Sequence, residues 1–422
     1  MNLTFVALNY APSVGGAQTL VRELAEGLVG RGHRVQVLTT DSLGTPGSAD
    51  HRRISPKDEV VRGVTVRRFG TRGPLGTVLN AVRWVRSRTH LVTNGRVLSG
   101  AIPPILSGPW SVPFARAVRR AHATDDVVVG CSAPFLTLVA VPFLRGRGRA
   151  ADICMPLLHL QAGAPHPWVV RALRRADGTT ATTSHELARQ AELGISPSAI
   201  ALLPPGVDPE QFPDRTAAEA RAELGLPERL TVGYVGRLAR YKGIDTLFDA
   251  SRCLWDRRPE LTVLVAGSPS GWVDFDTVAA GVAAVGGDRL VVRTAFTDAE
   301  KALLFSACDV VVFPSREESF GIVTVEAWAS RRPVVAADID AVRSLIRDGI
   351  DGDLVPVDDD RALADAVEAL LADPARRAAY GHAGRHRVEA ELSWSRIIDQ
   401  WEDFLQVATA RRDRRADSTG VR

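Results

Sequence analysis

Two glutamates, Glu318 and Glu326, are separated by seven residues that include a glycine, Gly321. The apolar run DVVVF comes shortly before them and predicts a buried strand. If a helix begins near Gly321, its first amides are unpaired and favour an anion, and the two carboxylates flank that helix end. Ionised carboxylates only accept hydrogen bonds, which suits them to sugar hydroxyls, so the pattern matches a nucleotide sugar. The amides concerned are those of Gly321, Ile322 and Val323.

Two cations, Arg237 and Lys242, follow another predicted strand in the segment GYVGRLARYKG. They lie on the loop that leads into a helix expected from about Ile244. Arginine offers a planar fork and lysine a point charge, so the two can clamp a diphosphate and neutralise charge on a departing nucleotide. The segment therefore predicts a phosphate site at the carboxyl end of a strand.

A third candidate is the turn YAPSVGGAQ, in which Gly15 and Gly16 join the first strand to the first helix. Backbone amides at a helix N-terminus favour an anion, although a tight turn alone would also explain two glycines. The segment does not contain the G-x-G-x-x-G fingerprint, which argues against a nicotinamide-dependent oxidoreductase.

Short apolar runs alternate with segments of helical period along the whole chain, as in parallel strands joined by crossover helices. We expect strands in the first half at residues 3–8, 35–39, 64–68, 127–131, 153–158, 179–183 and 200–203. We expect strands in the second half at residues 231–235, 261–266, 310–313 and 333–336. The predicted fold class is α/β, with two doubly wound, Rossmann-like parallel sheets that face a central cleft.

The proline-rich segment LPPGVDPEQFP separates the two alternations. We expect an N-terminal, acceptor-side domain over residues 1–207 and a C-terminal, nucleotide-sugar-binding domain over residues 208–392. An amphipathic helix at about 393–410 is expected to cross back to the first domain, and residues 411–422 to form a disordered basic tail.

The 422 residues carry a net charge of +3, which is too near balance to indicate nucleic acid. The four cysteines lack a CxxC pair and are expected to be reduced core residues. No basic leader or apolar stretch of membrane-spanning length occurs. We therefore expect a cytoplasmic protein, with peripheral contact at the inner face of the membrane left open.

Three Asp-x-Asp segments, at 274–276, 338–340 and 351–353, match the spacing of a metal-dependent transferase. That spacing is common, and the cations at 237 and 242 can already neutralise a diphosphate, so no obligatory metal is expected. His382 and His386 have zinc-ligand spacing but lack an HExxH motif, and a solvated helix face is the preferred interpretation.

Taken together, these motifs resemble glycosyltransferase family 4, also called group 1, whose members are retaining enzymes of GT-B architecture. The resemblance spans nearly the whole chain: the YxPxxGGAQ turn, the PPGVD linker, the GRLxxxKG loop, the E-x7-E element with its SFG insert and a Trp-bearing last helix. It implies a nucleotide diphosphate sugar as donor, UDP, GDP or ADP linked, and transfer by same-face attack.

The resemblance also assigns roles to residues. Arg237 and Lys242 would bind the donor diphosphate, Glu326 the ribose hydroxyls and Glu318 the transferred sugar. The catalytic set would be completed by His159, which stands where the family has a histidine near the reacting carbon. Other donor contacts would come from Gly15, Gly16, Ser319, Phe320, Gly321, Ile322, Val323 and the loop Arg293-Thr294-Ala295, where Ala295 replaces the usual glycine.

Two alternatives remain open, a sugar-nucleotide epimerase of the same architecture and a non-catalytic sugar-nucleotide binder. The acceptor, whether lipid, glycan or small molecule, cannot be read from the motifs. The segment between Pro74 and Pro113 mixes apolar and basic residues, among them Arg83, Arg86 and Arg88, and is our candidate for an acceptor site at a membrane surface.

Overall fold

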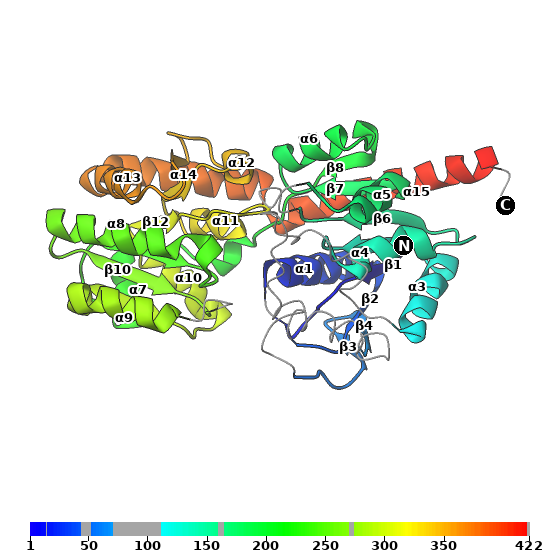
Figure 1. The fold of residues 1–422 in the computed structure, drawn as a ribbon, viewed down its shortest axis with the longest axis horizontal. Helices are drawn as coiled ribbons and strands as arrows, with labels where there is room; N and C mark the ends of the chain where they lie inside the picture. The colour runs from blue at the N-terminus through cyan, green and yellow to red at the C-terminus, as the bar shows by residue number, and fades with distance from the viewer. Residues whose placement is uncertain (14, 44–51, 71–110, 159–163, 270–273, 420–422) are drawn as a thin grey trace, which may run out of the picture. The chain divides into compact units, whose positions relative to one another are not determined.

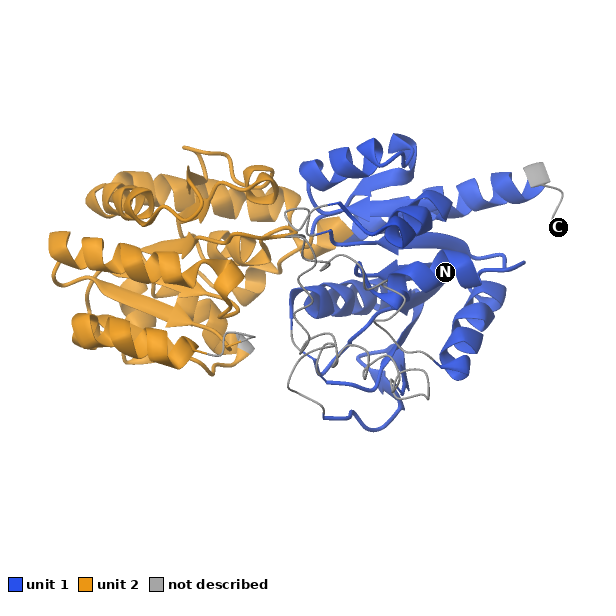
Figure 2. Cartoon of the chain, viewed as in Figure 1, with its two compact units in different colours: residues 1–204, 398–422 blue, residues 205–397 orange. Residues whose placement is uncertain are grey.

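A computed structural model describes residues 1–13, 15–43, 52–70, 111–158, 164–269 and 274–419. The chain forms two compact units, residues 1–204 with 398–422, and residues 205–397 (Figure 2). The predicted α/β class with two doubly wound sheets is confirmed.

Unit 1 contains, in its described part, an eight-stranded sheet of order β3-β4-β2-β1-β5-β6-β7-β8 (Figure 1). All neighbours pair in parallel except β3 with β4. Its strands are β1 Asn2–Val6, β2 Arg34–Thr40, β3 Asp58–Val61, β4 Val64–Phe69, β5 Val127–Cys131, β6 Ala151–Met155, β7 Gly178–Ala181 and β8 Ile200–Leu202. Its helices are α1 Gly16–Gly30, α3 Val112–Thr124, α4 Leu136–Leu144, α5 Pro167–Arg175 and α6 Ser184–Glu192.

Unit 2 contains a six-stranded parallel sheet of order β11-β10-β9-β12-β13-β14, with helices on both faces (Figure 1). Its strands are β9 Thr231–Val235, β10 Thr262–Ala266, β11 Leu290–Arg293, β12 Val310–Phe313, β13 Val334–Ala337 and β14 Gly352–Val355. Its helices are α7 Ala217–Leu224, α8 Ile244–Arg257, α9 Phe275–Gly286, α10 Asp298–Ser306, α11 Ile322–Ala329, α12 Asp340–Arg343, α13 Asp360–Ala372 and α14 Pro374–Glu391.

The central strands form because runs of Val, Ile and Thr are buried on both faces of a parallel sheet. Every residue of β9 and β12 is buried. Gly233, in the middle of β9, provides the space for a helix end, because a Cβ there would overlap the Sγ of Cys308 after α10. Gly233 therefore lets the segment after α10 pack directly against the sheet.

The last helix, α15 Trp394–Thr419, differs from the sequence expectation. Residues 411–419 were expected to be disordered, but they continue the helix. The reason is that their arginines have acceptors in unit 1: Arg411 donates to the carbonyl of Asp177 at 3.0 Å, and Arg412 donates to the carbonyl of Gly148 at 2.8 Å. In the described part of the chain, no helix is long and apolar enough to span a membrane.

Candidate functional site

The strand order of unit 2 reverses between β9 and β12. From β9 the chain adds β10 and then β11 on one side, and then returns to place β12 on the other side of β9. In open α/β sheets, ligands bind outside the carboxyl ends of the strands at such a switch point. The two loops that leave β9 and β12 are the segments in which sequence analysis placed the cations and the first glutamate.

The loop after β9 is held in one conformation by buried contacts. The hydroxyl of Tyr234 donates to the carbonyl oxygen of Arg237 at 2.7 Å, and burial raises the pKa of this phenol well above its ordinary value, so it remains a donor. Gly243 ends the loop with a φ of +67°, and a Cβ there would overlap the carbonyl oxygen of Pro314 after β12. Only glycine lets the two loops approach this closely.

The two loops bring their charged side chains together. The ammonium group of Lys242 forms an ion pair with Oε1 of Glu318, which also accepts a hydrogen bond from Ser315 Oγ at 3.2 Å. Glu318 is only 8% exposed. The same ammonium lies 5.1 Å from the ring centre of Tyr241, and the guanidinium of Arg237 donates to the Tyr241 hydroxyl at 3.5 Å. The predicted juxtaposition of cations and glutamate is therefore present within one site.

Helix α11 begins at the predicted place. Its N-cap is Gly321, with a φ of +95°, and no side chain caps the first turn, which contains no acidic residue. Buried Phe320 anchors the loop just before the cap, and the side chains of Ile322 and Val323 are half-buried. The predicted start of the helix is confirmed, and a helix N-terminus of this kind favours an anion.

Glu326 lies in the same helix and is 8% exposed. Its Oε1 forms an ion pair with Lys301 of α10. Its Oε2 is buried, and within the described residues this oxygen has no hydrogen-bond partner. A buried carboxylate oxygen without a donor is costly, so this atom marks a position where a ligand donor would be stabilised.

Other predicted residues are not brought to this cluster by any described contact. Thr294 and Ala295 follow edge strand β11 and are exposed. Gly15 is the N-cap of α1 and Gly16 is its first residue, in the other unit. His159 lies outside the described residues, as do the arginines of the candidate acceptor segment, Arg83, Arg86 and Arg88.

Sequence analysis did not identify Arg316, which joins the two site loops. Its amide donates to the carbonyl of Tyr241 at 2.8 Å, and its guanidinium donates to both oxygens of Asp245 at 2.9 and 3.1 Å. It also forms an ion pair with Asp358 at 2.6 Å. The sequence does place Arg316 directly after Ser315, in the loop that follows a predicted strand. An arginine in a loop is, however, equally consistent with a solvent-exposed surface charge.

Within the described part of the chain, five of the six carboxylates of the three Asp-x-Asp segments, all but that of Asp276, form ion pairs with arginines. In order along the chain, the ion pairs are Arg240–Asp274, Arg343–Asp338, Arg343–Asp340, Arg347–Asp351, Arg387–Asp351 and Arg376–Asp353. Among the described residues, no group of three or more His, Cys, Asp or Glu side chains is placed to hold a metal ion.

Comparison with known proteins gives the family. The chain matches Glycosyltransferase Family 4 over residues 14–211 and Glycosyl transferases group 1 over residues 217–387. The D-inositol 3-phosphate glycosyltransferase 1 of Catenulispora acidiphila is 30% identical over 406 residues, which cover 92% of this chain and 89% of that protein.

Solved structures share the fold. Sucrose-phosphate synthase from Thermosynechococcus elongatus has a TM-score of 0.73 at 23% identity and covers 97% of this chain and 99% of its own. Anabaena Alr3699/HepE, solved in complex with UDP and glucose, has a TM-score of 0.71 at 19% identity and covers 96% of this chain and 99% of its own. The chain therefore has the GT-B fold and belongs to glycosyltransferase family 4, the group 1 glycosyl transferases, as a retaining hexosyltransferase that uses a nucleotide sugar.

Proposed function

We propose that this enzyme transfers a hexosyl group from a UDP-sugar to a hydroxyl group of a small phosphorylated polyol, on the same face of the sugar ring. The donor base follows the Anabaena protein, solved with UDP, and the acceptor class follows the relative named for D-inositol 3-phosphate. The observation that carries the donor half of the proposal is the ion pair between Lys242 and Glu318 at the switch point of unit 2.

The diphosphate binds to the cations and to the start of α11. A phosphate oxygen takes the place of Glu318 on the ammonium of Lys242, and Arg237 contributes a second positive charge. The uncapped amides of Ile322 and Val323 add donors at the positive end of the helix. These groups stabilise the charge that collects on the diphosphate as the sugar leaves.

The carboxylates bind the hydroxyl groups on either side of the diphosphate. Once Lys242 pairs with phosphate, Glu318 accepts hydrogen bonds from the sugar. The unpartnered Oε2 of Glu326 accepts from the ribose while Lys301 keeps its hold on Oε1. Each buried carboxylate is then satisfied in the complex.

In the reaction, the bond between the sugar C1 and the diphosphate oxygen breaks, and its electron pair leaves with the nucleotide. The acceptor oxygen forms a new bond to C1 from the same face, and its proton passes to the leaving phosphate oxygen. No side-chain nucleophile is required. His159 remains a predicted contact of the reacting carbon.

The first experiment measures hexosyl transfer by wild-type enzyme and by Glu318→Gln, with UDP-glucose as donor and inositol 3-phosphate as acceptor. A hydrogen bond to a charged group contributes about 1.5–3 kcal/mol, so the rate should fall by roughly 10- to 100-fold. Glu317→Gln is the matched control, because it makes the same change on the adjacent residue, for which no contact with Lys242 is described. Equal losses in the two variants would refute the assignment of Glu318.

The second experiment tests the ribose contact by calorimetry. Glu326→Gln should weaken binding of UDP but leave binding of a 2′,3′-dideoxy analogue of UDP nearly unchanged, because the analogue lacks the hydroxyl donors. A uniform loss for both ligands would show that Glu326 acts on the fold of the site rather than on the ribose.

The acceptor class is tested separately. Wild-type enzyme is given inositol, inositol 3-phosphate, an oligosaccharide and a glycolipid in turn, each with UDP-glucose. Transfer only to the phosphorylated polyol supports the proposal, and transfer only to glycan or lipid contradicts its acceptor half while leaving the donor half intact.

A further inference from the structure

An arginine-rich pocket lies at one edge of the unit 1 sheet. This edge is opposite the one that carries the Gly15–Gly16 turn. Its loop, residues 145–149, joins α4 to the amino end of β6. The strands β1, β5 and β6 run parallel, so their amino ends lie at one edge. The Gly15–Gly16 turn follows the carboxyl end of β1 and so lies at the opposite edge. The pocket is therefore separate from the predicted phosphate contacts of this unit.

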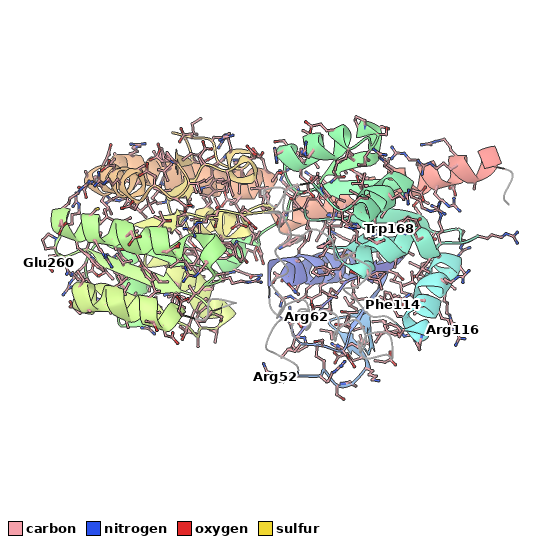
Figure 3. The ribbon with its side chains drawn as sticks, viewed as in Figure 1. Arg52, Arg62, Phe114, Arg116, Trp168 and Glu260 are labelled. Atoms are coloured by element: carbon pink, nitrogen blue, oxygen red, sulfur yellow. The ribbon has the colours of Figure 1, made fainter. Side chains whose placement is uncertain are left out.

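The pocket is open, has a volume of about 480 Å³, and has four arginines but no carboxylate in its wall. Its wall is made by Arg119, Ala123, Arg145, Gly146, Arg147, Gly148 and Arg149. Helix α3 presents further arginines to solvent, and Figure 3 shows Arg116 on its outer side while Phe114 is buried on its inner side.

Backbone contacts fix the loop against α3 and α15. Gly148 packs so closely on α3 that a Cβ there would lie 2.5 Å from the Cβ of His122. Its carbonyl accepts from Arg412 of α15 at 2.8 Å. Arg149 donates to the carbonyl of Thr124 at the end of α3 at 3.0 Å. The wall of the pocket is therefore built on rigid elements.

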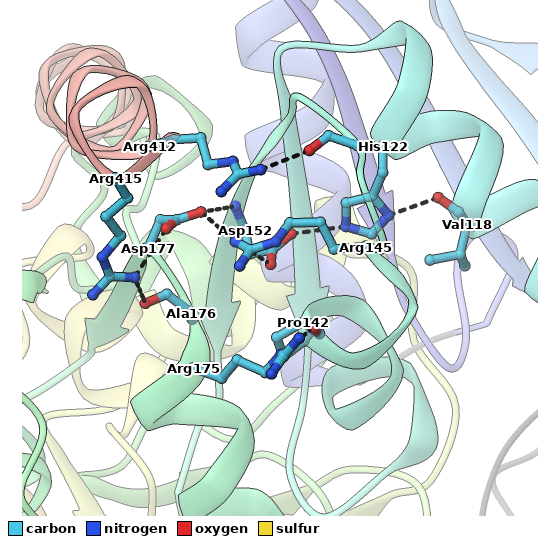
Figure 4. A network of polar contacts seen from close by, with 11 residues as sticks. Val118, His122, Pro142, Arg145, Asp152, Arg175, Ala176, Asp177, Arg412 and Arg415 are labelled. Carbon is cyan, nitrogen blue, oxygen red and sulfur yellow. Dashed lines mark hydrogen bonds and ion pairs between the residues drawn. The ribbon is translucent and has the colours of Figure 1, made fainter. Parts of the chain in front are cut away.

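Two buried carboxylates, those of Asp152 and Asp177, lie behind the wall and bond to side chains there (Figure 4). Asp152 and Asp177 are fully buried, and Arg145 lies 2.9 and 2.8 Å from their carboxylates. His122 bonds to Asp152 at 2.7 Å, and Arg415 bonds to Asp177 at 3.0 Å. These carboxylates neutralise Arg145 and Arg415, and within the described part of the chain they do not pair with the other arginines of the wall.

Three arginines of the wall therefore carry uncompensated charge. Arg119, Arg147 and Arg149 are exposed, and within the described residues none of them forms an ion pair with a carboxylate. Guanidinium groups match phosphate oxygens in pairs, and convergent cations of one sign mark an anion site. Among the described residues, Ala123 is the one hydrophobic residue of the wall.

The geometry points to a second binding site, for a soluble phosphorylated small molecule, at this arginine pocket. The ligand is anionic, because four arginines and no carboxylate line the wall among the described residues. Since Arg412 of α15 also bonds to the loop, the ligand would bind beside the last turns of that helix.

The test is calorimetry on the full-length protein with inorganic pyrophosphate as the probe. It compares wild type, the double variant Arg119→Ser/Arg147→Ser and the control Arg120→Ser, which removes an exposed arginine of the same helix outside the pocket wall. The double variant should bind at least about tenfold more weakly, and the control should bind within about twofold of wild type. Unfolding curves establish that all variants are folded.

A Lys242→Ala variant separates this pocket from the proposed donor site, and pyrophosphate binding through Arg119 and Arg147 should persist in it. Binding that disappears in Lys242→Ala, or that is lost equally in Arg120→Ser, overturns the inference. So does the absence of any pyrophosphate binding. Sedimentation with phosphatidylglycerol vesicles identifies the source of phosphate: arginine-dependent binding to vesicles without binding of pyrophosphate also overturns it.

Discussion

Replacement of Gly243 by alanine should disrupt the proposed donor site through one methyl group. Gly243 has a left-handed φ of +67°, and its Cβ position overlaps the carbonyl oxygen of Pro314. The chain provides a matched control in Gly225, which ends α7 with a φ of +64° and has no atom within 4 Å of its Cβ position. Both substitutions impose the same backbone strain, and only one adds the overlap.

The expected loss in the free energy of unfolding is the sum of two contributions, the backbone strain and the steric overlap. Alanine in the left-handed region costs about 1 kcal/mol, and this cost applies to both glycines. Overpacking adds typically 1–3 kcal/mol. Gly225→Ala should therefore lower the free energy of unfolding by about 1 kcal/mol, and Gly243→Ala by about 2–4 kcal/mol. Pro314 cannot yield easily, because the contact is with its backbone.

Two assays check this prediction. Denaturant unfolding, followed by a probe of unit 2, measures the difference in stability between the two variants, and calorimetry measures UDP affinity. We expect weaker UDP binding in Gly243→Ala only, because the overlap moves the two loops that carry Lys242 and Glu318. Equal destabilisation of the two variants, or unchanged UDP affinity in Gly243→Ala, would refute the argument that close loop approach builds the site.

Two further predictions concern buried groups. Arg415→Ala should lower the free energy of unfolding by about 1–2 kcal/mol, because it removes a bond to the buried Asp177 carboxylate. Arg414→Ala removes an exposed neighbouring arginine, and it should change the free energy of unfolding by less than about 0.5 kcal/mol in the same assay. Burial raises the pKa of the Cys308 thiol from 9.0 to about 12, so Cys308 should resist a thiol reagent at pH 9 until the chain unfolds, and rapid labelling of the folded protein would contradict this. Since the unfolded thiol loses its proton first, the contribution of Cys308 to stability should decline as the pH rises from 9 toward 12.

Sequence patterns located the strands that are buried on both faces. The bounds of β5, β9 and β12 match the predicted ranges because each is a short apolar run with strong β propensity. The pattern missed β3, a partly exposed edge strand, β11, an edge strand whose residues are all only partly buried, and β14, which contains Gly352 and Asp353. Glycine is required in β14 because a Cβ there would lie 2.8 Å from the carbonyl of Val334 on the neighbouring strand. That contact joins residues that are distant in the sequence, so the local sequence of β14 does not indicate it.

The candidate site was predictable to a similar extent. The side chains of Lys242 and Glu318 were identified from their types and from the strands before them. Arg316 and Lys301 were not identified, because each pairs with a carboxylate that is distant in the sequence, Arg316 with Asp245 and Lys301 with Glu326. Which strand neighbours β9 is a property of the whole sheet and cannot be read from either loop.

The bond between Lys242 and Glu318 also selects among small molecules. Before any ligand arrives, the two charges screen each other, and the vacant site has little net attraction for a lone ion. Inorganic phosphate can satisfy the ammonium, but it leaves a carboxylate that is 8% exposed without its counterion. A neutral sugar can donate hydrogen bonds to the carboxylate of Glu318, but it leaves the ammonium of Lys242 without a counterion. In the proposed function, a nucleotide sugar satisfies both partners, because it presents a diphosphate to Lys242 and sugar hydroxyl groups to Glu318.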